Sequence, residues 1–260
     1  GKRIFFGSLL TVGFASLLLG EGWLAARDYY CLPASLRGLP FALLACLLAG
    51  PACLELRQLA ALKGLNTSIF FMIFTVFCII LIPFYSSFTA FCSPFAILLA
   101  LIFLAAMAHA CRCGTAGTIA HLSVISFSSI YLGLGMYFLL ALRLLNPSAA
   151  SAWGQSGPLL MFLATVKSAD IGAYFTGRFL GRHKWVPAIS PAKTWEGLAG
   201  GILLAIIVAS LFSAFSGIIS VVEGVIFGFM VSVSGQLGDL MESMLKRDAG
   251  SKDSAHLVPE

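Results

Sequence analysis

The sequence predicts an all-α, polytopic transmembrane helix bundle of about eight spans, with a polar cavity that its C-terminal helices form and that faces the cytoplasm. Three observations lead to this prediction. Hydrophobic residues make up 59% of the chain, charged residues make up only 10%, and the mean hydropathy is +0.97. A soluble domain could not cover its surface with so few charges, so the sequence indicates an integral membrane protein.

Eight apolar windows are candidates for membrane helices, because the hydrocarbon core of a bilayer requires about 20 apolar residues per helix. Lys2 and Arg3 precede the first window, which we interpret as a membrane helix rather than a signal peptide, because no clear small-residue cleavage site follows it. The windows centre on residues 4–19, 40–54, 69–84, 94–110, 122–145, 157–177, 198–215 and 221–240.

The basic residues predict the orientation of these spans. An eight-helix path that starts inside places all of the sixteen Lys and Arg on the cytoplasmic side except Arg27, Arg37 and Arg143. Two polar blocks, 167–196 and 239–253, are then expected to face the cytoplasm. Positively charged inner loops and anionic lipid headgroups also account for the net charge of +5, which therefore does not indicate a nucleic-acid partner.

The first half of the chain has few candidate catalytic or ligand-binding residues. His109 lies near the end of a window, and we interpret it as a scaffold or dimer-contact residue. The seven cysteines are odd in number and do not indicate a disulfide framework, and Cys111 and Cys113 lack the second pair of ligands of a typical zinc site. We therefore expect residues 1–146 to form a transmembrane scaffold and dimer region, and residues 147–260 to form the catalytic region.

The sixth window contains two charged residues, Lys167 and Asp170. A charge near the bilayer centre costs about 3 kcal/mol unless it faces a cavity or a partner. Because the two residues are three positions apart on a helix, they either shield each other as an ion pair or face a polar cavity. This segment alone leaves both interpretations open.

The next polar segment predicts a helix start, with Ser190 as N-cap and Pro191 at the first helical position. Lys193 would then lie in the first turn, where the helix dipole disfavours a cation. An anionic ligand held by free backbone N–H groups and by the Lys193 ammonium would resolve this conflict. The alternative is a lysine side chain that extends to the lipid headgroups.

The last window contains small and polar residues at helical spacing. Small residues at this spacing also occur where helices simply pack closely. However, Asp239 and Glu242 are one turn apart and are followed by Lys246 and Arg247, a composition typical of a hard-cation site beside phosphate-binding cations. The whole stripe consists of Gly228, Ser232, Gly235, Asp239, Glu242, Ser243 and Lys246.

Three ordered motifs in residues 157–260 carry a family resemblance. They are Asp170-x-Gly172-Ala173-Tyr174-Phe175-x-Gly177-Arg178, Ser190-Pro191-x-Lys193-Thr194-Trp195-Glu196-Gly197, and Ser243-x-x-Lys246-Arg247 with Lys252-Asp253 and Val258-Pro259. Together they resemble the phosphatidate cytidylyltransferases, or CDP-diacylglycerol synthases. That family's pattern continues into His-Gly-Gly and Asp-Arg-x-Asp, which are absent before Glu260, so we expect a chain truncated at its end.

The resemblance implies transfer of the cytidylyl group of CTP to phosphatidate, which gives CDP-diacylglycerol and pyrophosphate. It also implies Mg²⁺ together with K⁺, a homodimer, and a bacterial cytoplasmic (inner) membrane location. The lipid phosphate would attack the α-phosphorus of CTP, so the site must align two polyanions and neutralise their charge. No nucleophile from the protein is required.

The expected site residues come from these motifs. The metal ligands would be Asp239 and Glu242, and the catalytic residues would be Asp239, Lys193, Lys246 and Arg247. Ser190, Lys193 and Thr194 would bind nucleotide phosphates, and Lys246, Arg247 and Lys252 would hold the lipid phosphate or pyrophosphate. The full set of expected substrate-binding residues is Asp170, Tyr174, Ser190, Lys193, Thr194, Glu196, Lys246, Arg247, Lys252 and Asp253.

Two other functions remain as alternatives. A CTP-dependent polyprenol or dolichol kinase would also require a metal and a basic cytoplasmic face, but it would transfer the γ-phosphate. A membrane transporter would use Lys167, Asp170 and Asp239 as its intramembrane charges. The transporter also predicts paired broken helices in both halves, and the nearly charge-free first half argues against it.

Overall fold

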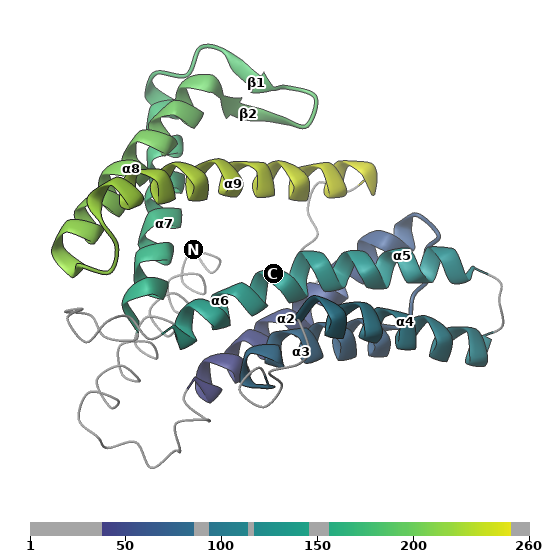
Figure 1. Cartoon of the computed structure of the whole chain (residues 1–260). Coiled ribbons are helices and arrows are strands. Elements are labelled where there is room, and N and C mark those ends of the chain that lie inside the picture. The colour runs from purple at the N-terminus through teal and green to yellow at the C-terminus, as the bar shows by residue number, and fades with distance from the viewer. Residues whose placement is uncertain (1–37, 86–93, 114–116, 146–155, 251–260) are drawn as a thin grey trace. The chain divides into compact units, whose positions relative to one another are not determined.

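The structure is a computed structural model that describes residues 38–85, 94–113, 117–145 and 156–250. This part of the chain is helical apart from one two-stranded sheet (Figure 1). Some predictions fall outside the described residues: the window 4–19, residues Lys252 and Asp253, and the side chains of His109 and Cys113. The described helices divide into two compact units near Leu145, while the functional division at residue 146 stays a prediction.

The first unit is built from apolar helices around an aliphatic core. Met72, Ile79 and Ile125 are fully buried there. The buried Ser129 hydroxyl donates to Thr75 Oγ1 at 3.1 Å, so these two polar groups satisfy each other inside the core. The elements are α2 (Leu39–Leu62), α3 (Ile69–Tyr85), α4 (Pro94–Cys113), α5 (Thr118–Ser128), the π-helical turn η2 (Ser129–Leu134) and α6 (Gly135–Leu144).

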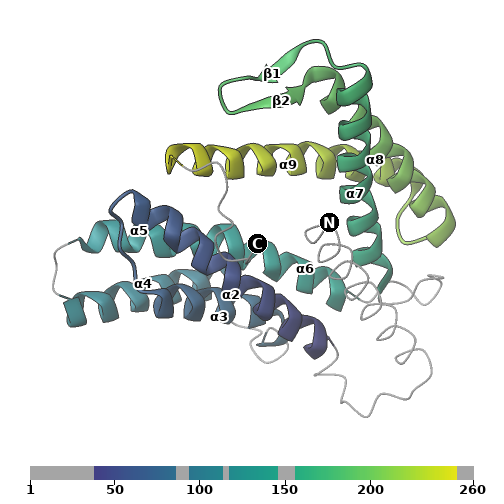
Figure 2. The same cartoon turned by 180° about the vertical axis from the view of Figure 1, so that it is seen from behind.

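The second unit contains three long helices and a β-hairpin. Figures 1 and 2 show the hairpin between the end of α7 and the start of α8. A left-handed Gly217 (φ 65°) ends α8, and Ser220 and Glu223 form a reciprocal capping box that begins α9. The elements are α7 (Gly157–Phe179), β1 (Lys184–Val186), β2 (Ser190–Thr194), α8 (Trp195–Ser216) and α9 (Val221–Asp248).

Close packing of α8 against both α7 and α9 depends on glycine. A Cβ added to Gly172 of α7 would lie 2.6 Å from the main-chain oxygen of Gly200 in α8. A Cβ added to Gly228 of α9 would lie 2.7 Å from Ile206 Cα. The start of the small-residue stripe on α9 is therefore a packing surface, whereas a Cβ on Gly235 would meet nothing within 4 Å.

The helical and membrane-spanning character of the chain is confirmed. Within the described ranges, five helical segments are long and apolar enough to cross a bilayer, and each coincides with a predicted window: Leu39–Leu62, Thr118–Leu144, Gly157–Phe179, Trp195–Ser216 and Val221–Asp248. A shorter apolar helix, Ile69–Pro83, coincides with another window. The total of eight spans stays a prediction.

The predicted helix start at Ser190 is wrong. Residues Ser190–Thr194 form strand β2, which pairs antiparallel with β1, and α8 begins only at Trp195. The residue before a proline is biased toward extended backbone, and a two-stranded edge tolerates the missing N–H of Pro191. Thr194 is the true N-cap, because its Oγ1 accepts a hydrogen bond from the Gly197 N–H at 3.1 Å.

Candidate active site

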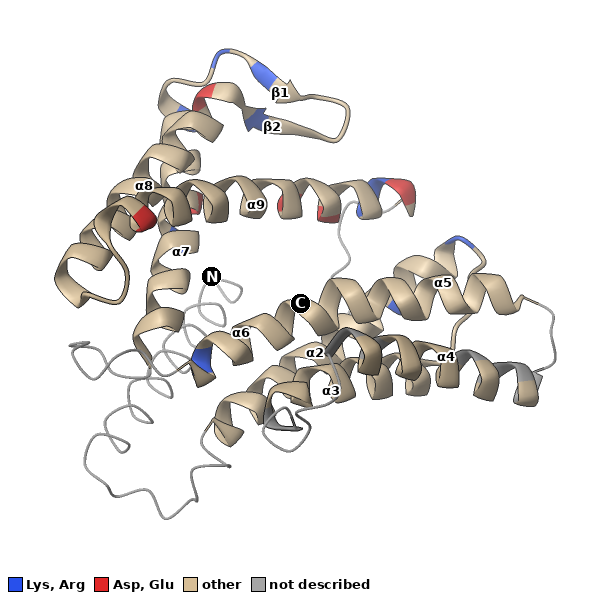
Figure 3. Ribbon diagram, in the orientation of Figure 1, with Lys and Arg blue, Asp and Glu red and all other residues tan. Residues whose placement is uncertain are grey.

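A polar pocket of about 300 Å³ lies in the second unit, where α7, the hairpin, the start of α8 and α9 meet. Figure 3 shows charged residues of this unit on α7, on the hairpin, at the start of α8 and along α9. The polar side chains that line the pocket are those of Asp170, Tyr174, Lys193, Thr194, Gln236 and Asp239. Sequence positions from 170 to 239 thus contribute to one cavity.

Lys193 connects the hairpin to α9. Its ammonium lies 3.5 Å from Asp239 Oδ2 and donates to the main-chain oxygen of Gln236 at 3.2 Å. The Lys193 side chain is only 18% exposed, so it does not extend to the membrane surface. The predicted conflict with the helix dipole is absent, because Lys193 precedes the N-cap and has a carboxylate partner.

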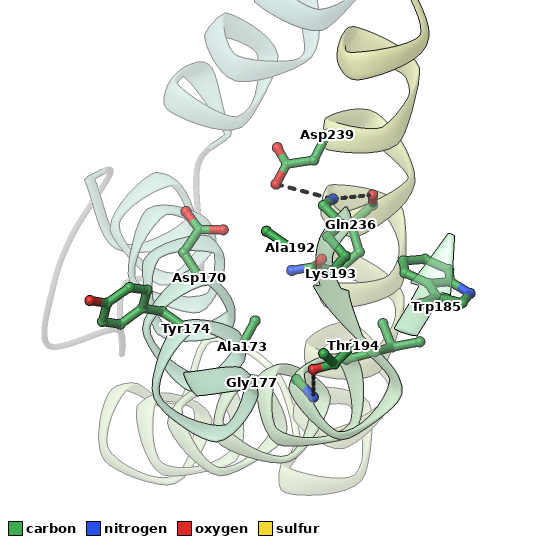
Figure 4. Close-up of a pocket in the computed structure, with 12 residues that line it drawn as sticks. Asp170, Ala173, Tyr174, Gly177, Trp185, Ala192, Lys193, Thr194, Gln236 and Asp239 are labelled. Atoms are coloured by element: carbon green, nitrogen blue, oxygen red, sulfur yellow. Dashed lines mark hydrogen bonds and ion pairs between the residues drawn. The ribbon is translucent and has the colours of Figure 1, made fainter. Parts of the chain in front are cut away.

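Two carboxylates face the pocket from different helices, Asp170 from α7 and Asp239 from α9. Figure 4 shows Asp170 and Tyr174 across the cavity from Lys193 and Gln236. Asp170 interacts electrostatically with Asp239 and with Lys193. Its Oδ2 also lies 4.0 Å from Lys167 Nζ on the same helix, so the predicted ion pair is present, and Asp170 faces the cavity while Lys167 does not line it.

The pocket has the donor set of a hard-cation site completed by a substrate. Its charged lining consists of two carboxylates and one ammonium, so the lining carries a net negative charge. No group of three or more His, Cys, Asp or Glu side chains lies together in the described ranges. Mg²⁺ characteristically binds through one or two carboxylates together with substrate phosphates and water, which Asp170 and Asp239 fit.

The hairpin is held against α8 by His183 and Glu196. The Glu196 carboxylate accepts from the His183 main-chain N–H at 3.2 Å and lies 2.6 Å from His183 Nδ1. The rings of Trp185 and Trp195 are 5.7 Å apart. Glu196 was predicted to bind substrate, but it does not line the pocket. Its hydrogen bonds give it a role in positioning the hairpin.

Two backbone N–H groups at the start of α8 already have protein partners and are not free to bind an anion. The Trp195 N–H donates to the His183 main-chain oxygen at 3.0 Å, and the Gly197 N–H donates to Thr194. Ser190 lies in β2 and is not among the residues that line the pocket. The predicted phosphate cradle of free N–H groups is therefore not formed at Ser190, and Lys193 is the cation that the structure brings to the cavity.

The expected residues at the end of α9 are not brought to the pocket. Glu242 accepts from Lys246 at 2.6 Å along the same helix, and neither residue lines the cavity. Arg247 is also absent from the pocket lining. Of the two predicted metal ligands, Asp239 lies in the cavity and Glu242 does not. Asp170 is the carboxylate that faces the cavity with Asp239.

Several residues that line the pocket were not expected from the sequence, and Trp185 and Gln236 are the two with polar side-chain groups. Gln236 lies one turn before Asp239 on the same helical face, so its position could have been found from periodicity. Its neutral side chain produced no signal in a search for charges. Trp185 could not be found this way, because its place depends on the pairing of β1 with β2.

A family model described as "Cytidylyltransferase family" matches residues 29–260. The phosphatidate cytidylyltransferase of Bacillus subtilis (strain 168) is 39% identical over 138 residues, which cover 52% of this chain and 48% of that protein. The phosphatidate cytidylyltransferase of Haemophilus influenzae is 45% identical over 106 residues, which cover 39% and 37%.

A further relative has no assigned activity in its name. It is the "Uncharacterized protein YnbB" of Escherichia coli (strain K12), which is 38% identical over 107 residues, covering 40% of this chain and 36% of that protein. The matched region thus spans about half the length or less of these relatives.

Proposed function

Because the chain belongs to the cytidylyltransferase family, we propose that it transfers the cytidylyl group of CTP to phosphatidate, giving CDP-diacylglycerol and pyrophosphate. The observation that carries this proposal is one pocket in a membrane-embedded unit that contains Asp170, Lys193 and Asp239 from three different elements. The names of the Bacillus and Haemophilus relatives support the same reaction.

The reaction needs alignment and charge neutralisation from the protein. An oxygen of the phosphatidate phosphate attacks the α-phosphorus of CTP and forms a new P–O bond. The bond from that phosphorus to the oxygen bridging to the β-phosphate breaks, and pyrophosphate leaves with the electron pair. Both reactants are polyanions, so a cation beside the α- and β-phosphates favours their approach and the departure of pyrophosphate.

Asp239 and Asp170 are the proposed ligands of Mg²⁺, with a potassium ion nearby. The donor chemistry of the pocket supports this assignment, since carboxylates are the preferred protein ligands of Mg²⁺. When bound, Mg²⁺ would neutralise charge on the nucleotide phosphates. Glu242 stays a proposed ligand only if its pairing with Lys246 is broken.

Lys193 is proposed to exchange partners during binding. Its ammonium lies 3.5 Å from Asp239 and neutralises that carboxylate. If Asp239 instead binds a divalent cation, the Lys193 ammonium becomes available for a nucleotide phosphate, and Thr194 lies beside it in the pocket wall. One flexible lysine thereby links the two binding events.

The remaining assignments are also proposals. Lys246, Arg247 and Lys252 would hold the lipid phosphate or pyrophosphate, and Asp253 would orient its own segment of the chain or the metal. The positive charge of the 178–184 segment and of the α9 terminus supports an active site at the cytoplasmic face of a bacterial inner membrane. The family resemblance supports a homodimer.

Labelled CTP tests the proposed reaction. Purified full-length protein with vesicles that contain phosphatidate and polyprenol, in Mg²⁺, is expected to transfer label from [α-³²P]CTP to lipid and to release pyrophosphate. Label in lipid from [γ-³²P]CTP, with CDP as the other product, would identify a lipid kinase instead. Absence of lipid labelling from either nucleotide would refute both enzymatic functions.

A further inference from the structure

Gln236 is a buried polar side chain on the wall of the pocket. The residue is 7% exposed and lines the cavity. Its contact with Lys193 uses the main-chain oxygen, and among the described residues no hydrogen bond from or to its side-chain amide is found. Because the residue lines the cavity, an amide without a protein partner is left to bind water or a ligand there. An amide left in this way on a pocket wall is typical of a ligand-binding group.

The side-chain amide of Gln236 determines which hydrogen-bonding groups the ligand must present. A glutamine side chain has an oxygen that accepts and an N–H₂ group that donates, so a ligand that satisfies both must present a donor beside an acceptor. Ionised phosphate groups and the acyl esters of phosphatidate only accept hydrogen bonds. The Watson–Crick edge of cytosine has its 4-amino donor next to the N3 acceptor, and it matches the amide in the way that adenine matches Asn or Gln.

The surroundings of Gln236 also suit a nucleobase. Trp185 lines the same pocket, and Figure 4 shows Trp185 and Gln236 on the side of the cavity opposite Asp170 and Tyr174. An indole ring offers a face on which a base can stack. Ala192 and Leu198 add apolar lining. The charged groups that suit phosphates and the neutral groups that suit a base are thus present in one cavity.

We infer that Gln236 recognises the cytosine ring of the nucleotide, with its amide oxygen accepting from the 4-amino group and its amide N–H donating to N3. Trp185 supplies the stacking surface. This inference rests on the proposed function, because it takes CTP as the ligand of the pocket. Gln236 is then a specificity-determining residue that differs in role from the phosphate-binding and metal-binding residues.

The test combines a substitution with a nucleotide analogue. Equilibrium binding of CTP to purified full-length protein in Mg²⁺ is compared with binding of the pyrimidin-2-one ribonucleoside triphosphate, which lacks the 4-amino group. The wild type is expected to bind the analogue about tenfold more weakly than CTP. Gln236→Met, which is similar in length, is expected to weaken CTP binding about tenfold and to bind CTP and the analogue within about twofold of each other.

Ser234→Ala is the matched control, because Ser234 is exposed on the same helix and does not line the pocket. It should bind both nucleotides like the wild type. Gln236→Met keeps the main-chain anchor of Lys193, so binding of divalent cations should not change. The analogue comparison on the wild type requires no substitution and holds even if the variant misfolds.

Two outcomes are distinct. If the wild type binds CTP but binds the analogue equally well, or if Gln236→Met keeps the full preference for CTP, the base contact is refuted while the proposed function stands. If the wild type does not bind CTP at all, the proposed function and this inference both fail.

Discussion

Replacing Lys193 with methionine should change metal binding and nucleotide binding in opposite directions. The Lys193 ammonium lies 3.5 Å from Asp239, whose side chain is 57% exposed. A half-exposed ion pair of this kind is worth about 1 kcal/mol after solvent screening. Removing the lysine therefore frees the Asp239 carboxylate and should strengthen binding of a divalent cation without nucleotide by about fivefold.

The same substitution should weaken CTP binding, because a charge-assisted contact to a phosphate is worth about 1.5–3 kcal/mol. This free energy corresponds to a loss of affinity of roughly 10- to 100-fold. Binding of Mn²⁺ as a Mg²⁺ substitute can be followed by electron paramagnetic resonance on the apoprotein, and CTP binding by equilibrium dialysis. The two measurements report the two predicted partners of Lys193 separately.

Lys184→Met is the control, since Lys184 lies in β1 on the same hairpin, is exposed, and does not line the pocket. It should change neither affinity by more than about twofold. Weaker Mn²⁺ binding in Lys193→Met would contradict the competition between Lys193 and the metal. Unchanged CTP binding would refute the exchange of partners.

Three further predictions test the site and the packing. Asp239→Asn should lower turnover at least about 100-fold, whereas Glu242→Gln should change turnover less than about threefold, because Glu242 lies outside the pocket and pairs with Lys246. Steady-state labelling assays measure both variants, and equal losses of turnover would restore Glu242 as a metal ligand. Gly172→Val should destabilise the protein by more than about 2 kcal/mol, because the new side chain would collide with α8. Gly235→Ala should be nearly neutral, because a Cβ at this position meets no atom within 4 Å. Thermal unfolding in detergent measures both effects. Thr194→Val should cost about 1 kcal/mol through loss of the N-cap of α8, and an unchanged unfolding temperature would argue against Thr194 as the cap.

Local hydropathy explains why most helices could be predicted. Helix α3 (Ile69–Tyr85) follows the predicted window 69–84, and α7 (Gly157–Phe179) follows 157–177. An apolar run of this length has few stable alternatives in a bilayer, because its backbone must satisfy its own hydrogen bonds. The error at Ser190 has a local cause as well, since Ser-Pro fits both a helix start and an extended strand, and only the pairing with β1 distinguishes them.

The partners of the charged side chains could not be predicted in the same way. Spacing along the helix paired Asp239 with Glu242, and these residues are indeed one turn apart. In the structure Asp239 pairs with Lys193, and Glu242 pairs with Lys246. Carboxylates one turn apart on a helix can face different surroundings, and the hairpin that carries Lys193 approaches only one of them.

The sequence by itself determined the membrane-spanning helices, the polar blocks and the motifs that indicated the cytidylyltransferase family, because these depend on composition and short-range order. The tertiary structure decided which residues share the pocket. The close approach of α8 to α7 and α9 at Gly172 and Gly228 fixes how the helices lie, and the pairing of β1 with β2 directs Lys193 toward α9. Contacts between residues far apart in the chain arise from this packing, so Gln236 and Trp185 became candidate binding residues only once the helices and hairpin were assembled.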